Sequence, residues 1–125
     1  MNRAGIGAVL LLALLMGGLF FGHQLEAMQL PIAAEVEAAQ RYAQAGNYPE
    51  AARAAAEAER AWYAGRTFTA CLVDHRPMEE IEALFAGLRA YGEQKPRQYI
   101  ATCAQLALRL RTLAESQRLN ISSFF

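Results

Sequence analysis

The sequence has no excess of charge of either sign and lacks the usual motifs of enzymes. Its 12 basic and 12 acidic side chains give a formal net charge of zero, and no stretch gathers more than two neighbouring Lys or Arg side chains. Nucleic acid is therefore not expected as a partner, because phosphate backbones bind basic surfaces. Serine-nucleophile motifs, glycine-rich phosphate loops and paired carboxylates on one helical face are also missing. We therefore expect no enzymatic activity, no cofactor and no metal site.

β-Branched residues are few, and no segment alternates apolar and polar residues as a strand does. An all-α fold is predicted, with turns wherever Pro and Gly interrupt the helical periodicity. Short connections between helices favour antiparallel neighbours, so we expect about four helices in a small antiparallel bundle of two hairpins, spanning residues 30–125. The expected helices cover approximately residues 31–45, 48–62, 77–94 and 96–119, the first of them opened by Pro31.

One long hydrophobic run stands at the N-terminus. Residues 4–22 contain no charged side chain, and as a helix these 19 residues would measure about 28 Å, close to the hydrocarbon thickness of a bilayer. The run predicts a transmembrane helix, with residues 1–29 forming an anchor and stalk and the lipid bilayer as a partner. The alternative is a cleaved signal peptide, but its apolar region is usually shorter, and Phe20 and Leu25 stand where cleavage needs small residues.

The flanks of this run predict its orientation. Arg3 precedes it, whereas no Lys or Arg follows it until Arg41. The positive-inside rule then places the N-terminus in the cytoplasm and the C-terminal domain outside it, on the cell membrane. Gly18 and Gly22 form a GxxxG pair that could support a homodimer within the membrane.

Each expected helix carries an apolar stripe at three- and four-residue spacing, and the second stripe is mostly alanine, which allows close approach of a neighbouring helix. The predicted core residues are Ile32, Val36, Ala39, Tyr42, Ala43, Ala51, Ala54, Ala55, Ala58, Ala61, Trp62, Ile81, Leu84, Phe85, Leu88, Tyr91, Ile100, Cys103, Leu106, Leu110 and Leu113.

Two polar features invite chemical interpretations. Asp74 and His75, with Glu79 and Glu80 nearby, could bind a divalent cation, but a single histidine without a second histidine or cysteine at ligand spacing favours a helix cap at Asp74 instead. The only two cysteines are Cys71 and Cys103. The bundle register would separate them by about 9 Å along the helix axis, so two buried free thiols are expected rather than a disulfide.

The residues most suggestive of a docking or structural motif are Trp62, Asp74, His75 and the pair Phe124 and Phe125. Because no catalytic site is visible, our leading hypothesis is an interaction module that binds a membrane or envelope protein. The alternatives are a helical bundle that senses a small molecule or a metal through a membrane partner, and a processed, secreted helical protein.

The order of these features resembles a family of short, single-pass bacterial proteins known as domain of unknown function 4363. The resemblance rests on the N-terminal span, the turn Ala45-Gly46-Asn47-Tyr48, the helix leading to Trp62, the Asp74-His75 pair with Ile81 after it, and an Arg- and Leu-rich last helix with Glu115 and Leu119-Asn120-Ile121. The sequence departs from the family in its arginines, its high alanine content and the tail of residues 122–125. The resemblance implies membrane attachment and a helical extracytoplasmic domain, and it brings no known activity or catalytic residue.

Overall fold

The computed structural model describes the backbone of residues 3–124 and the side chains of residues 3–116. Over that range the chain is helical and contains no strand, as predicted. The elements are α1 (Arg3–Gln44), α2 (Tyr48–Ala64), α3 (Arg66–Leu72), α4 (His75–Tyr91), the 3-10 turn η1 (Gly92–Gln94) and α5 (Pro96–Phe124).

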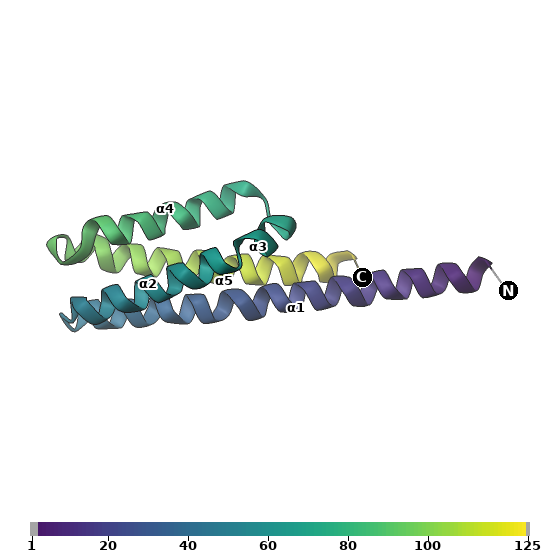
Figure 1. Ribbon diagram of the computed structural model, residues 1–125, viewed down its shortest axis with the longest axis horizontal. Coiled ribbons are helices and arrows are strands. Elements are labelled where there is room, and N and C mark those ends of the chain that lie inside the picture. The colour runs from purple at the N-terminus through teal and green to yellow at the C-terminus, as the bar shows by residue number, and fades with distance from the viewer. Residues whose placement is uncertain (1–2, 125) are drawn as a thin grey trace.

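Helix α1 is a single rod of 42 residues that joins the apolar run to the bundle (Figure 1). The prediction that Pro31 opens a separate helix is wrong, because Pro31 lies inside α1. Proline removes one backbone hydrogen bond, here to the carbonyl of Ala27. Both residues are exposed, so water can satisfy that carbonyl. The helix also continues through the boundary expected between residues 29 and 30, and Leu25 and Gln29 of the presumed stalk are buried.

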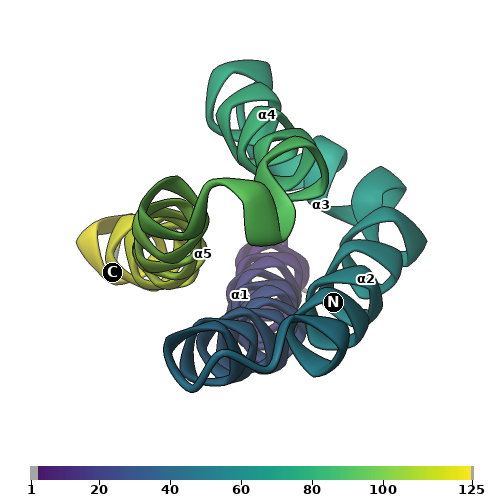
Figure 2. The same cartoon turned by 90° about the vertical axis from the view of Figure 1, so that its left-hand side faces the viewer.

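The bundle contains two antiparallel hairpins, α1 with α2 and α4 with α5 (Figure 2). Helix α5 also runs antiparallel to α1 and makes the most extensive interface in the molecule, whereas α2 and α4 touch only sparsely. The first hairpin turns at Gly46, whose φ of 78° favours glycine. Asn47 then caps α2 by accepting a hydrogen bond from the backbone N–H of Glu50.

The core follows the predicted stripes closely. Alanines fill the α1–α2 contact, and larger side chains fill the space between α4 and α5. Tyr42 and Ala61 are exposed rather than buried, and Leu84, Tyr91 and Ile100 are only half-buried. The structure adds buried residues that the stripes omitted, namely Leu25, Gln29, Ala33, Thr69, Met78, Tyr99, Thr102, Ala107 and Ala114.

The connection between α2 and α4 is more ordered than expected. It forms the short helix α3, and α4 begins at His75, two residues before Pro77. Pro77 fits there because the N–H groups of a first helical turn have no partner within the helix. A buried hydrogen bond ties this connection to α1: the Gln29 Nε2 donates to the Thr69 Oγ1 over 3.2 Å, and that hydroxyl donates to the carbonyl of Gly65.

Candidate functional site

Trp62 is a core residue with a charged partner. Its side chain is 1% exposed, and its indole Nε1 donates a hydrogen bond of 2.9 Å to the Glu82 Oε2 on α4. Arg66, four residues after Trp62 at the start of α3, donates to both carboxylate oxygens of Glu82 at 2.6 and 3.3 Å. Trp62, Arg66 and Glu82 therefore form one polar node that fastens α2 to α4.

Electrostatics favour the ionised carboxylate of Glu82 in this node. The guanidinium of Arg66 and, to a smaller extent, the indole N–H of Trp62 lower the pKa of Glu82, against the opposing effect of partial burial. The same hydrogen bond raises the pKa of Arg66. Glu82 was not among the candidate residues predicted from the sequence. Two signals pointed to such a partner. A buried indole needs a hydrogen-bond acceptor, and Arg66, four residues after Trp62, can pair with a carboxylate.

Asp74 and His75 lie at the junction of α3 and α4, and both are exposed. Asp74 occupies the cap position of α4 with an extended backbone, but its side chain makes no capping hydrogen bond. Since Trp62 is buried and this pair is exposed, the three residues do not form one surface. Phe124 and Phe125, the remaining members of the expected docking motif, lie outside the residues whose side chains the structure describes.

The cysteines are both free, as expected. The expectation that both are buried is wrong for Cys71, which is exposed, because the second helix ends at Ala64 and α3 turns this position outward. Burial raises the pKa of the Cys103 thiol to about 12. Among the residues that the structure describes, no three His, Cys, Asp or Glu side chains gather in a way that could hold a metal ion.

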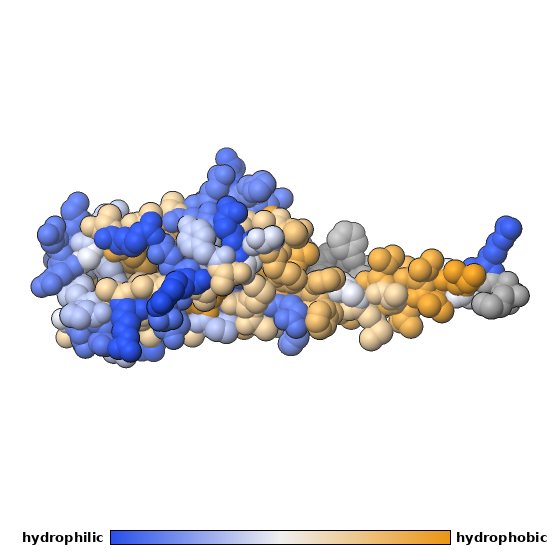
Figure 3. Space-filling view, viewed as in Figure 1, coloured by the Kyte–Doolittle hydropathy of each residue, from blue (hydrophilic) through white to orange (hydrophobic). Residues whose placement is uncertain are grey.

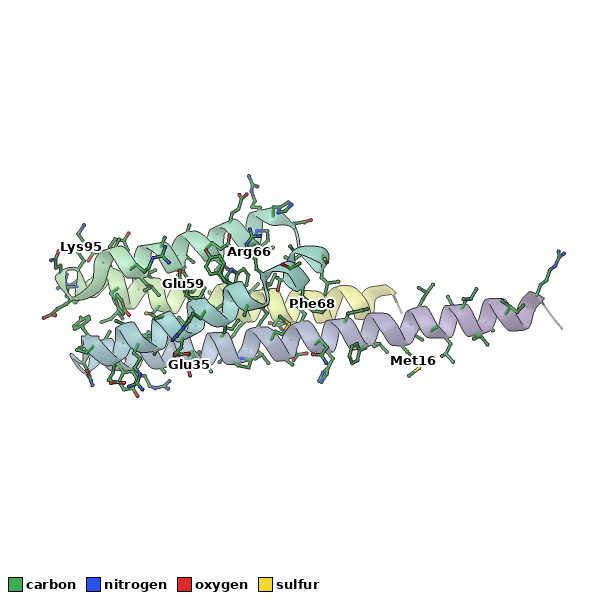
Figure 4. All side chains as sticks on the ribbon, in the orientation of Figure 1. Met16, Glu35, Glu59, Arg66, Phe68 and Lys95 are labelled. Carbon is green, nitrogen blue, oxygen red and sulfur yellow. The ribbon has the colours of Figure 1, made fainter. Side chains whose placement is uncertain are left out.

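The sparse contact between α2 and α4 leaves a cleft of about 220 Å³ at the end of the bundle far from the apolar run. We call it the α2–α4 cleft. Its floor contains Phe85 and Leu88 of α4 with Tyr99 of α5, and an ion pair between Arg89 and Glu59 bridges the two helices at its side. Glu59 of α2 and Arg66 of α3 lie on the side that faces α4 (Figure 4). The remaining lining residues are Tyr48, Ala52, Ala55, Ala56, Gly92 and Glu93.

Tyr99 is the unusual member of this cleft. It is 3% exposed, its ring packs edge-on to that of Tyr48 at 5.9 Å between centroids, and its buried hydroxyl has no hydrogen-bond partner. Burial raises the pKa of Tyr99 to about 12, so the phenol remains neutral at physiological pH. The spacing of Cys103, Leu106 and Leu110 extends back to Tyr99, but the predicted stripe of the last helix began at Ile100 and so left this position out.

A second hollow follows the contact between α1 and α2. It measures about 760 Å³, but it is open to solvent along its length. Met28, Ile32 and Ala61 form its base, and the charged side chains Glu35, Arg53 and Glu57 border it. This shape is a surface trough and gives a ligand little enclosure.

The GxxxG pair is partly covered within the single chain. Gly22 is buried and Gly18 is half-buried. The homodimer through these two glycines stays a prediction. It would require the helix face around Gly22, which is buried within the single chain, to become accessible to a second copy.

A long apolar helix that continues into an antiparallel helical bundle defines the class of this molecule: an all-helical protein with one segment long and apolar enough to cross a bilayer. The family described as a domain of unknown function, DUF4363, matches residues 19–123. The chain belongs to this family, as its motifs predicted. No curated protein and no solved structure matches it.

Proposed function

We propose that this chain is a membrane-anchored interaction module that binds another membrane or envelope protein and performs no chemistry of its own. Residues 4–22 support the anchor, because the most apolar stretch of α1 has no part buried within the chain, and the face of it that Figure 3 shows is mostly hydrophobic. Transfer of such a surface from water to lipid is strongly favourable. The positive-inside rule supports a cytoplasmic N-terminus and an extracytoplasmic bundle.

The observation that carries the interaction role is the α2–α4 cleft. Pockets for drug-sized ligands usually measure about 300–1,000 Å³, whereas this cleft measures about 220 Å³. Its size therefore suits one or two side chains of a partner better than a whole metabolite. Apolar side chains that fill such pockets dominate the energy of many protein interfaces. Phe85, Leu88 and the rings of Tyr48 and Tyr99 provide the matching apolar wall.

Filling the cleft tests this role. Ala56 lines the cleft and is exposed, so Ala56→Trp should occupy the space without disturbing the core. Ala104→Trp, at a position of α5 that is also exposed, is the matched control. The full-length protein carrying a photo-crosslinker at Ala52 should capture one partner in native membranes, and Ala56→Trp should abolish that capture while Ala104→Trp retains it. Equal capture by both variants would exclude the cleft as the binding site.

Orientation and processing have separate tests. Fusions of reporters that are active only inside or only outside the cytoplasm, placed after α5, distinguish the two orientations. The intact mass of the purified protein distinguishes an uncleaved anchor from a processed, secreted protein.

A small-molecule sensor is the second candidate, and the buried Tyr99 hydroxyl favours it. A buried polar group without a partner costs about 1–3 kcal/mol, and a ligand acceptor in the cleft could remove that cost. A metabolite that raises the melting temperature of the wild-type protein, but not of Tyr99→Phe, would support this candidate. A panel without any such ligand would favour the interaction module.

A further inference from the structure

The register between α1 and α5 places the end of α5 beside the apolar run. Glu26 and Leu30 of α1 line the same small cleft as Arg111 and Glu115 of α5. In an antiparallel pair with this register, residue 119 is level with Gly22, and residue 124 is level with Gly17. The last turn of α5 therefore extends about 8 Å along the apolar run, at 1.5 Å per residue. Figure 1 shows the C-terminal end of α5 alongside this part of α1.

Helix α3 lies at almost the same level. The ring of Phe68 packs against that of Phe21, the penultimate residue of the apolar run, at 5.9 Å between centroids (Figure 4). The hydrogen bond from Gln29 to Thr69 fixes the other side of α3. Cys71 is exposed, and Leu72 is 37% exposed on the outer surface of α3.

The segments of α3 and α5 at the level of the span boundary contain no charged side chain. Residues 67–73 and residues 119–124 contain no Asp, Glu, Lys or Arg. The opposite end of the bundle, in contrast, carries Glu93, Lys95 and Arg97 within five residues. On the face that Figure 3 shows, apolar surface continues from the span onto the near end of the bundle, hydrophilic side chains project where α4 begins, and the far end is mostly hydrophilic.

We propose that α3 and the last turn of α5 form a second membrane contact, in which they lie in the headgroup and upper acyl region of the bilayer around α1. This inference rests on the proposed anchoring of residues 4–22. The occupant is lipid because α3 and the backbone of this last turn of α5 lie at the boundary of the span. Interfacial helices commonly bury their apolar faces about 5–10 Å into this region, which matches the depth that the register gives to α5. The bundle therefore stands directly on the membrane.

Cys71 offers a native probe of this contact. The full-length protein, one copy per phosphatidylcholine nanodisc, is labelled with bimane at Cys71, and Cys103 stays unlabelled because it is buried with a raised pKa. The matched control is the double variant Cys71→Ser, Gln94→Cys, which moves the label to an exposed position in η1. Quenching is measured with lipids that carry a shallow nitroxide and with aqueous iodide. A single copy in each nanodisc excludes shielding by a second chain.

We expect lipid nitroxide to quench the label at Cys71 and iodide to quench it poorly, with the reverse order for the label at position 94. Leu72→Asn should increase iodide quenching at Cys71 without loss of helical circular dichroism, because a side-chain amide resists transfer from water and, being neutral, does not repel iodide. Iodide quenching at Cys71 equal to that at position 94, in a protein that remains in the nanodisc, would overturn the second contact and leave the anchor intact. A protein that fails to enter nanodiscs would overturn the anchor and this inference together.

Discussion

Loss of the carboxylate at Glu82 should destabilise the protein by stranding a buried donor. In Glu82→Ala the indole N–H of Trp62, which is 1% exposed, loses its acceptor, and an unsatisfied buried group costs about 1–3 kcal/mol. The ion pair with Arg66 adds little, because that side chain is 40% exposed and solvent screens it. We expect a loss of about 2 kcal/mol, or about 8 °C in melting temperature for a domain of this size.

Glu82→Gln separates the acceptor from the charge. The amide oxygen can still accept from Trp62, so this variant should lose less than half as much stability as Glu82→Ala. Glu57→Gln is the control, since Glu57 pairs only with the exposed Arg60, and it should change stability by less than about 0.5 kcal/mol.

The assay follows unfolding of the full-length protein in detergent by intrinsic fluorescence. Trp62 is the only tryptophan, so the signal reports directly on this node. If Glu82→Ala unfolds with the same midpoint as the wild type, or if Glu82→Gln is as unstable as Glu82→Ala, the hydrogen bond to the indole does not stabilise the fold as we reason.

The node also predicts a pH dependence. Because the pKa of Glu82 is lowered in the folded state, its contribution is complete above the unfolded pKa of about 4.3. It is lost as the pH falls through the folded pKa. The wild-type protein should therefore lose more stability between pH 6 and strongly acidic solution than Glu82→Gln does, and parallel stability profiles would contradict this.

Three further predictions concern the core. Gln29→Leu should be neutral or stabilising in thermal unfolding, because the buried Oε1 of Gln29 has no partner. The Thr69 hydroxyl keeps its hydrogen bond to the carbonyl of Gly65 in this variant. A large loss of stability would mean that a water or ligand binds the Gln29 side chain. Ala58→Leu should destabilise by about 1–3 kcal/mol in denaturant titrations, since Ala58 is fully buried among close-packed helices. A maleimide at pH 8 should modify one thiol, Cys71, in the folded protein and also Cys103 after denaturation; two equivalents in the folded protein would contradict the burial of Cys103.

Much of the bundle could be predicted because helical periodicity reports directly on burial. Ile32, Val36 and Ala39 recur on one face and are buried as predicted. The helix start predicted at Pro31 was wrong because a proline signal is local, whereas the packing of residues on both sides of the proline decides whether a helix continues. The break expected there was also the reason for separating a stalk from the bundle.

The candidate site was less predictable, because its parts come from different helices. The acceptor of Trp62 lies 20 residues away on α4. The α2–α4 cleft exists because the two hairpins pack sparsely along α2 and α4, and a sequence pattern does not predict how tightly two hairpins pack. Tyr99 was missed although it lies four residues before Cys103 on the same helical face, because the predicted stripe began at Ile100 instead. Asp74 was correctly placed at a helix start, yet its exposed side chain makes no capping bond although its backbone has the extended geometry typical of a cap residue.

The unbroken length of α1 gives the molecule the mechanics of a lever. With residues 4–22 in a bilayer, as we propose, Gln44 lies 22 residues beyond the boundary, or about 33 Å at 1.5 Å per residue. A tilt of about 20°, which is average for a transmembrane helix, would move that tip sideways by about 11 Å. Because α2 and α5 are packed along the same rod, the whole far end would swing with it. The tilt of α1 in the bilayer therefore sets how far from the membrane normal the α2–α4 cleft is presented.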